Sequence, residues 1–141
     1  MDEKKVTVRL ANPTDIRYLM REAYLSEDMI LRKIDQGEIF LLSVENQLAG
    51  YLRLEFLWST IPYIALMWIE EKYRKNGYSR LLLHFLADHL HQKSFRTLYS
   101  SSQVGEAQPQ SWHRHMGFIE CGILNGINEG GIGEVFFKKT I

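Results

Sequence analysis

The chain has 141 residues, which is the size of one compact domain, and we expect a single domain over residues 1–141. Its composition, 45% hydrophobic and 24% charged, is that of a folded protein and excludes a largely disordered one. Seventeen basic residues balance seventeen acidic residues, so no net charge attracts nucleic acid or an anionic membrane surface. We therefore expect no nucleic-acid partner and no membrane partner.

The start of the chain and its cysteine content bear on cellular location. Met1 is followed by charged residues rather than by an apolar signal segment, and Cys121, as the single cysteine, cannot form an intramolecular disulfide. The longest strongly apolar run, residues 64–69, is far shorter than the roughly 20 residues that a membrane-spanning helix needs. These features predict a cytoplasmic protein.

The beginning of the chain predicts a strand followed by two helices. Apolar and polar residues alternate over residues 6–10, as in a strand with one buried face. A cluster of capping residues, followed by apolar residues at helical spacing, predicts a helix from about residue 13 to residue 24. Ser26 is placed to cap a second, shorter helix, and Gly37 is placed to end it.

The remaining elements follow from the same kinds of signal. They are a hairpin of residues 39–44 and 48–57 with its turn at 45–47, an apolar central strand at 63–69, a helix at 79–92, a strand at 97–102, a short helix opened by Pro109 and ended by Gly117, and strands at about 118–124 and 134–139. In the second hairpin strand, Leu48 and Leu52 share a face opposite Arg53 and Glu55. The sequence therefore predicts an α/β (α+β) fold with the order strand, two helices, three strands, helix, strand, helix, two strands.

The junction between residues 63–69 and the helix at 79–92 is the segment richest in chemistry. A short basic loop containing Gly77 joins a buried strand to a helix start, where free N–H groups and the positive end of the helix dipole converge. Ser79 adds no bulk, and Arg74 contributes positive charge. Such a loop suits a phosphate group, although a plain turn with a helix cap explains the same residues when the loop is taken alone.

The same loop resembles a family motif. Residues 73–79 resemble the pyrophosphate loop of the GCN5-related N-acetyltransferases (GNAT), Arg/Gln-x-x-Gly-x-Gly/Ala, with Arg74 and Gly77 matching and Ser79 departing at the last position. Gly117 and Phe118 resemble the Gly-Phe pair that ends the last helix of that family. The order of elements is also similar, so the resemblance covers nearly the whole chain.

The resemblance implies a fold and an activity. The fold would be one GNAT-like domain with a central, mixed, mostly antiparallel sheet flanked by helices. The activity would be transfer of an acetyl group from acetyl-CoA to a primary amine, by direct attack in a ternary complex. The pyrophosphate of CoA would lie on Arg74, Lys75, Asn76, Gly77, Tyr78, Ser79 and Arg80, and its pantetheine arm along the main chain of Trp68 and Ile69. An N–H group close to Met67 or Trp68 would polarise the thioester, while the Trp68 side chain itself is more simply part of the core.

Two positions depart from what the family usually has. Ala65 lies on the strand where many members have a carboxylate that acts as a base or orients water. His113 lies where many members have the Tyr that protonates the departing thiolate, so the resemblance implies that His113 is the acid. The alternative is a solvent-facing histidine. Both departures also favour a second function, a CoA-binding sensor or interaction domain with little or no catalysis.

Three further residues are candidates for the acceptor side. Glu55, on the polar face of its strand, is able to accept a proton from an amine, or it is simply a strand carboxylate paired with Arg53. Asn128 and Glu129 lie in the Gly-rich loop of residues 125–133 and are able to recognise an amine, or they belong to an ordinary hairpin loop. The acceptor would be a small molecule or a peptide amine.

No metal site is expected from the sequence. His84, His89 and His91 have no Cys or carboxylate at ligand spacing, and Cys121, inside an apolar strand, is most simply a small core residue. Dimers in the family use terminal strands, and both a monomer and a homodimer are compatible with this sequence.

Overall fold

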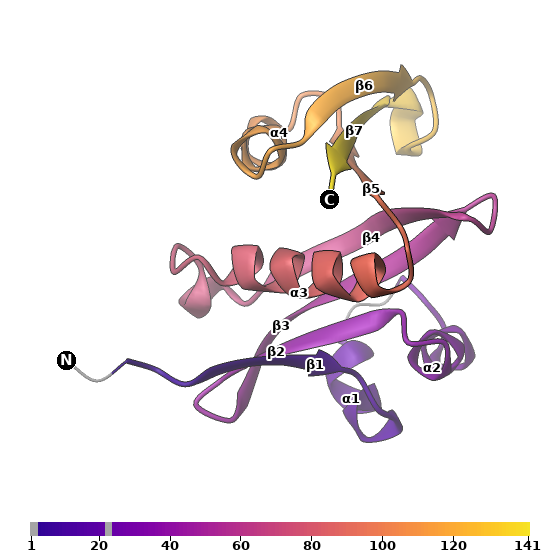
Figure 1. Cartoon of the computed structure of the whole chain (residues 1–141). Helices are drawn as coiled ribbons and strands as arrows, with labels where there is room; N and C mark the ends of the chain where they lie inside the picture. Colours follow the sequence, from indigo (N-terminus) through magenta and orange to yellow (C-terminus); the bar gives the residue numbers. More distant parts are fainter. Residues whose placement is uncertain (1–2, 22–23) are drawn as a thin grey trace. The chain divides into compact units, whose positions relative to one another are not determined.

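The structure is a computed structural model that describes residues 3–21 and 24–141 (Figure 1). The strands are β1 (Val6–Leu10), β2 (Ile39–Val44), β3 (Gln47–Leu57), β4 (Ile61–Ile69), β5 (Thr97–Gln103), β6 (Ile119–Leu124) and β7 (Glu134–Thr140). The helices are α1 (Ile16–Leu19), α2 (Glu27–Asp35), α3 (Tyr78–Gln92) and α4 (Ala107–His115), with 3-10 turns η1 (Pro13–Asp15), η2 (Glu71–Tyr73) and η3 (Glu129–Gly131). The predicted order of elements is confirmed. In the part of the chain that is described, no helix has the length and apolar character needed to cross a membrane.

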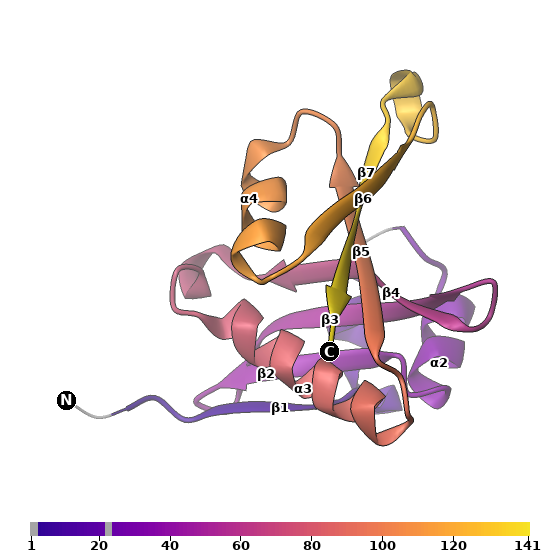
Figure 2. The same cartoon turned by 45° about the horizontal axis from the view of Figure 1, so that its top comes forward.

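The strands form one sheet in the order β1-β2-β3-β4-β5-β7-β6. β1, β2 and β3 pair antiparallel, and they lie side by side in Figure 2. β4 pairs in parallel with β5 through Tyr63 and Tyr99, and β7 pairs antiparallel with both β5 and β6. A mixed, mostly antiparallel sheet with β4 at its centre is therefore the predicted fold class, and it is confirmed.

The chain divides into two compact units. The first comprises the chain up to Leu54 together with Leu66–Leu86, and the second comprises Glu55–Ala65 and Ala87–Ile141. That the chain forms one domain stays a prediction.

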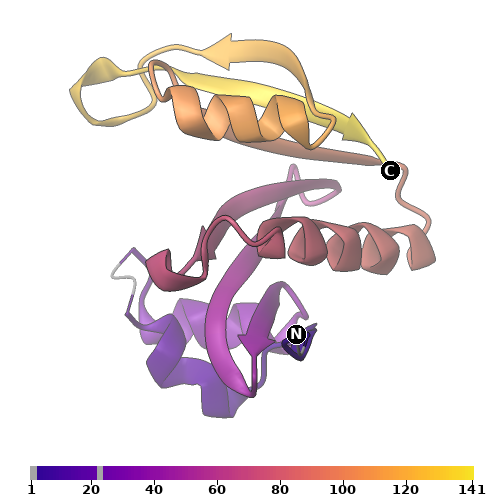
Figure 3. The ribbon, with the colours of Figure 1, turned by 90° about the vertical axis from the view of Figure 1, so that its left-hand side faces the viewer.

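The core of the first unit joins α1 and α2 to the first strands (Figure 3). Its buried members are Ala11, Leu19, Ile30, Ile34, Ile39, Leu41 and Tyr51. The signals that bound α2 are confirmed. The Ser26 hydroxyl accepts the Met29 N–H at 3.3 Å. Gly37 adopts a φ of 72°, which turns the chain so that the N–H of the next residue, Glu38, reaches the Lys33 oxygen at 2.9 Å.

The first helix ends earlier than predicted. α1 stops at Leu19, and residues 22–23 of the predicted helix lie outside the described residues. Met20 is 37% exposed and Tyr24 is 84% exposed, so these two residues bury little apolar surface. A short helix gains most of its stability from burying an apolar face, and this explains why the apolar spacing overestimated the length of α1.

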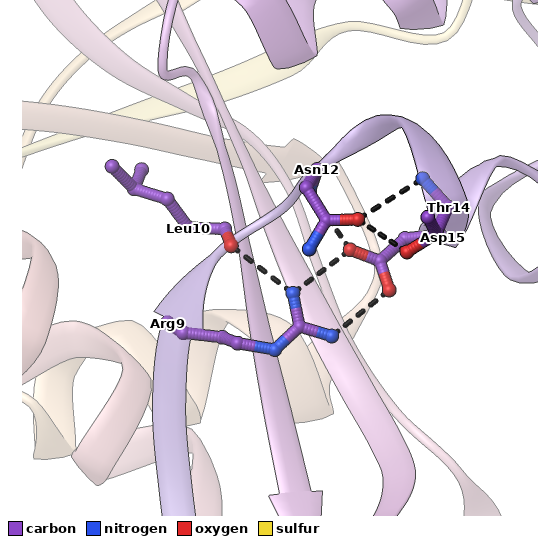
Figure 4. Close-up of polar contacts among 5 residues, drawn as sticks. All are labelled: Arg9, Leu10, Asn12, Thr14 and Asp15. Carbon is purple, nitrogen blue, oxygen red and sulfur yellow. Dashed lines mark hydrogen bonds and ion pairs between the residues drawn. The ribbon is translucent and has the colours of Figure 1, made fainter.

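A charged network fixes the turn between β1 and α1 (Figure 4). The Asn12 side chain accepts the N–H of Thr14 at 3.0 Å, and Asp15 accepts the N–H of Asn12 at 2.8 Å. Arg9 donates to both oxygens of the Asp15 carboxylate, at 2.8 and 2.9 Å. The hydrogen bond from Arg9 lowers the pKa of Asp15, and the N–H of Asn12 acts in the same direction.

The predicted hairpin of β2 and β3 is confirmed, but it contains a bulge. Glu45 and Asn46 form its turn, both with positive φ. The register shifts where Leu42 pairs with Gly50 and the next residue pairs with Leu48, which leaves Ala49 as the extra residue. The expectation that Leu48 shares a face with Leu52 is therefore wrong, because Leu48 packs against the core cluster that contains Tyr51.

In the second unit, α4 packs on one face of the sheet formed by β5, β7 and β6 (Figure 3). Pro109 lies in the first turn of α4, and Gly117, with a φ of 88°, follows the end of the helix as predicted. All residues of β6 are exposed, including Cys121, so the expectation of a core cysteine is wrong. The physical reason is that β6 is the outermost strand and has a bulge at Cys121.

Candidate functional site

The loop that joins β4 to α3 is held by hydrogen bonds to its own main chain. The Nε of Arg74 donates to the Ile69 oxygen at 2.8 Å, so the Arg74 side chain folds back over η2. The Nδ2 of Asn76 donates to the oxygens of Tyr73 and Arg74, each at 3.0 Å. Arg74 and Asn76 thus fix the course of the main chain just before α3.

The main chain of this loop is shaped for an anion. Lys75 and Gly77 have φ values of 64° and 78°, in the left-handed region, immediately before α3 begins at Tyr78. A Cβ added to Gly77 would meet no atom within 4 Å, so the space beside the main chain is open. The first N–H groups of a helix have no partner in the preceding turn and carry the positive end of its dipole. Because Arg74 and Lys75 are also exposed, the loop fits a phosphate or diphosphate group.

Glu70, which lies directly before the loop, forms a second set of contacts that holds the main chain. The N–H of Glu70 donates to the oxygen of the bulged residue Ala49 at 2.8 Å. The Glu70 carboxylate accepts from Arg21 at 2.8 Å and from the hydroxyl of Tyr18 at 3.5 Å. Glu70 therefore ties the end of β4 to β3 and to the end of α1. Sequence reasoning missed this contact, because its partners come from separate segments and follow no spacing pattern.

The end of β4 packs closely on β3. A Cβ at Gly50 would overlap the main-chain oxygen of Trp68 and lie 2.8 Å from the Cδ1 atom of Ile69. Ile69 is buried, and the ring of Trp68 packs against the core cluster, with its centroid 6.2 Å from that of Tyr51. The Trp68 side chain is thus part of the packing, and a role for the main chain of Trp68 and Ile69 in binding CoA stays a prediction.

His113, the predicted acid, lies in the interior of the second unit. Its side chain is only 4% exposed, so the alternative of a solvent-facing histidine is wrong. Its Nδ1 lies 2.7 Å from the oxygen of Pro109, its Nε2 lies 2.7 Å from the hydroxyl of Ser100, and its ring stacks on Phe137.

These contacts define which nitrogen of the neutral His113 ring carries the proton. The Pro109 oxygen only accepts, so the ring proton of the neutral form is on Nδ1, and Nε2 accepts from Ser100. Burial lowers the pKa of His113 below its ordinary value, against the opposing effects of Pro109 and Glu134. A catalytic role for His113 stays a prediction, beside a role in packing.

The three residues predicted to bind the acceptor amine lie in the second unit and differ in burial and in hydrogen bonding. Glu55 is half-buried in β3, and Glu129 is exposed at the start of η3. Asn128 is half-buried, and its Nδ2 donates to the Glu134 carboxylate at 3.0 Å. Asn128 is therefore engaged with a residue that the sequence did not single out, and the roles of the three in binding stay predictions.

Glu134 belongs to a polar cluster that sequence reasoning missed. Its other oxygen accepts from the hydroxyl of Ser101 at 2.6 Å, and the Ser101 oxygen lies 2.5 Å from the hydroxyl of Tyr63. Tyr63, Ser101 and Glu134 come from β4, β5 and β7. No local spacing could connect them, and the only signal in the sequence is the run of three serines within β5.

The predicted site residues thus fall into two groups. Trp68, Ile69 and the loop from Arg74 to Arg80 lie in the first unit, whereas Glu55, His113, Asn128 and Glu129 lie in the second. Among residues 3–21 and 24–141, no group of three or more His, Cys, Asp and Glu side chains is arranged to hold a metal ion.

Comparisons with known proteins assign the family. The model of the acetyltransferase (GNAT) family matches residues 8–118, and no curated protein matches the chain in sequence.

Solved structures have the same fold. Ard1 from Thermoplasma volcanium superposes with a TM-score of 0.85 at 15% identity, covering 96% of this chain and 97% of that one. The ribosomal-protein-S18-alanine N-acetyltransferase from Escherichia coli gives 0.79 at 19% identity, covering 97% and 94%. A GNAT-family acetyltransferase from Bacillus cereus gives 0.79 at 20% identity, covering 96% and 97%. The resemblance seen in the sequence is confirmed, and the chain belongs to the GNAT family of acetyltransferases.

Proposed function

We propose that the protein transfers an acetyl group from acetyl-CoA to a primary amine by direct attack in a ternary complex. The observation that supports this best is the loop from Arg74 to Arg80. It combines left-handed main chain at Lys75 and Gly77, open space beside Gly77, and the N-terminus of α3, in a chain of an acetyltransferase family.

In the proposed reaction the protein mainly positions the two substrates and polarises the thioester. The pyrophosphate of acetyl-CoA binds the loop, and its pantetheine arm follows the main chain of Trp68 and Ile69. A main-chain N–H close to Met67 or Trp68 stabilises the charge that develops on the thioester oxygen. The neutral amine attacks the carbonyl carbon, the C–S bond breaks, and the thiolate of CoA takes up a proton.

Two donors compete to supply that proton, His113 and water. His113 is the candidate from the sequence, but its Nδ1–H is directed at Pro109 and its Nε2 accepts from Ser100. To act as the acid, the ring must first be protonated on Nε2, and burial opposes this. Water is therefore the competing donor.

The acceptor in this proposal is a small molecule or a peptide with a free amine. A peptide acceptor is supported by the similarity in fold to the E. coli enzyme whose name specifies the alanine of ribosomal protein S18. Glu55, Asn128 and Glu129 are the proposed contacts for the amine. Replacing Glu55 or Glu129 by Gln should raise the KM for the amine and leave the KM for acetyl-CoA nearly unchanged.

Turnover with acetyl-CoA and a panel of amines tests the proposal. The panel should contain polyamines, aminoglycosides, amino acids and short peptides with a free N-terminus. The product should be detected by mass spectrometry, because the exposed thiol of Cys121 would react with reagents that detect free CoA. Acetylation of at least one amine class supports the proposal. Tight binding of CoA without any acetylation would instead identify a CoA-binding sensor or interaction domain.

A further inference from the structure

The turn that joins β3 to β4, in the second unit, carries an exposed tryptophan. The N–H of Thr60 donates to the oxygen of Leu57 at 3.1 Å, so Trp58 and Ser59 are the two central residues of a tight hairpin turn. Trp58 is 84% exposed, so most of its ring faces solvent. Its ring therefore adds little to the packing of the protein.

The main chain of this turn is also unfavourable for a tryptophan. Trp58 and Ser59 have φ values of 49° and 66°. A hairpin turn with positive φ at both central residues favours Asn and Gly there, and a bulky residue with positive φ is rare. Neither packing nor main-chain conformation explains Trp58, and a feature that costs stability on both counts points to a role in binding.

The loop between α3 and β5 lies beside the turn. The ring of Phe56, two residues before Trp58, packs on the ring of Phe95, with 5.6 Å between their centroids. β4 and β5 pair in parallel, so the turn before β4 and the loop before β5 lie at the same end of the sheet. All of these residues belong to the second unit.

This loop brings positive charge to the same end. Lys93 and Arg96 are both exposed. The guanidinium of Arg96 donates to two main-chain oxygens, at 3.0 and 3.4 Å. Within residues 3–21 and 24–141, no ion pair involves Lys93 or Arg96, so both charges are open to an external anion.

We propose that this end of the second unit docks on an anionic phospholipid surface. The ring of Trp58 enters the interfacial layer of the bilayer, where tryptophan is enriched. Lys93 and Arg96 lie over the phosphate head groups, which attract cations close to the surface. This docking goes beyond the proposed acetyl transfer and does not depend on it.

The small size of the tip favours a lipid surface over a protein or a nucleic acid. A stable protein interface buries about 800 Å² on each partner, whereas the tip offers one exposed ring and two cations. Single-stranded nucleic acid binds grooves in which several aromatic rings stack on successive bases. A lipid surface needs no complementary pocket, and one ring with a few cations gives weak, reversible binding to it.

The balanced net charge of the chain does not oppose this docking. The expectation of no membrane partner used the sum of charges over all residues. At 0.1 M salt, however, exposed charges act over only about 10 Å, so a lipid surface meets the charges near the tip and not the total. Binding should weaken as salt is added, because the attraction of Lys93 and Arg96 is screened.

The test is cosedimentation of the full chain with vesicles of phosphatidylcholine alone, and of phosphatidylcholine mixed equally with phosphatidylglycerol. The wild type should bind the mixed vesicles and not the neutral ones. Trp58→Ser should lower the partition coefficient about tenfold, and Lys93→Gln about fivefold. Arg96→Lys keeps the charge and should bind as the wild type does. The matched controls are Tyr24→Ser, also 84% exposed, and Lys5→Gln, both in the first unit and both expected to bind normally.

Tryptophan fluorescence separates insertion of the tip from general adsorption. The emission of the wild type should shift to the blue when mixed vesicles are added. Trp58→Phe should still bind, but its emission should not shift, because Trp68 and Trp112 are half-buried within the protein. A full blue shift in Trp58→Phe would overturn the insertion of Trp58.

A double variant keeps the test valid if Trp58→Ser disturbs the turn. Trp58→Asn combined with Ser59→Gly places the favoured Asn-Gly pair in the turn, so the Tm should rise while binding to mixed vesicles is lost. Wild-type binding by this variant would overturn the proposal.

Three further outcomes would also overturn the docking. They are no binding of the wild type to mixed vesicles, equal binding to both lipid compositions, and unchanged binding by Trp58→Ser. If a single-stranded RNA oligonucleotide binds in a manner that requires Trp58, and vesicles do not, the tip belongs to nucleic acid instead. Acetyl transfer is measured without lipid, so its failure and the failure of docking are distinguishable.

Discussion

The main-chain oxygen of Trp68 occupies the space where a side chain at Gly50 would begin. β3 and β4 approach closely there, one residue after the bulge at Ala49. Gly50→Ala should therefore force the two strands apart and lower the free energy of unfolding by about 1–3 kcal/mol, as overpacking does in other cores.

Chemical denaturation measures this effect, and Gly122→Ala is the matched control. Gly122 is also a strand glycine, but a Cβ there would meet no atom within 4 Å. Equal stability of the two variants would contradict the close approach at Gly50.

Gly77→Asp should weaken CoA binding by at least tenfold, or about 1.4 kcal/mol, because it puts a negative charge and a side chain beside the proposed pyrophosphate site. Isothermal titration calorimetry with CoA measures the loss. Gly105→Asp is the control, because Gly105 also has a positive φ and open space around it but lies before α4. If both variants bind CoA as the wild type does, the loop is not the CoA site.

The ion pair of Arg9 and Asp15 should make stability depend on pH. The pKa of Asp15 is lowered in the folded state, so its contribution is fully present above the ordinary Asp pKa of about 3.9 and is lost as the pH falls through the lower folded value. Asp15→Asn should thus be less stable than the wild type at neutral pH, and the difference should shrink in acid. Melting curves from neutral pH down to strongly acid pH test this, with Asp88→Asn, on the exposed side of α3, as the control. A difference that stays constant with pH would contradict the assignment.

His113→Phe distinguishes a catalytic histidine from a packing histidine. If His113 protonates the thiolate, the variant should lose about a hundredfold in turnover together with the alkaline limb of the pH profile, while CoA binding survives. If His113 serves packing, the variant should retain turnover and change mainly in stability.

The pH dependence of wild-type stability tests the lowered pKa of His113 independently of catalysis. The pKa of His113 is lowered in the folded state, so the unfolded chain takes up the proton first, and stability should decline as the pH falls below the ordinary His value of about 6.5. This slope should be smaller in His113→Phe, as followed by denaturation at several pH values, and the part due to His89, whose pKa burial also lowers, should remain. An identical slope in the two proteins would show that His113 does not titrate as described.

Local signals predicted the parts of this protein that depend on neighbouring residues. The sequence was sufficient to place the caps at Asn12 and Ser26 and the helix ends at Gly37 and Gly117. Each depends only on hydrogen bonds or a positive φ within a few residues of that position. The loop around Gly77 was found for the same reason.

Features that depend on distant strands were not predictable. The bulge at Ala49 appears only when β2 is paired with β3, and the exposure of Cys121 only when β6 is known to be outermost. The hydrogen bonds from Tyr63 through Ser101 to Glu134 join residues separated by 38 and 33 positions, which no periodicity reveals.

The outermost position of β6 makes the protein easy to label. Cys121 is the only cysteine and is exposed, so a maleimide dye or spin label would attach at one known position without any mutation. Cys121 pairs with no residue of β7, because the bulge leaves it outside the register of the two strands. A probe there would report from the second unit while leaving the loop around Gly77, in the first unit, chemically untouched.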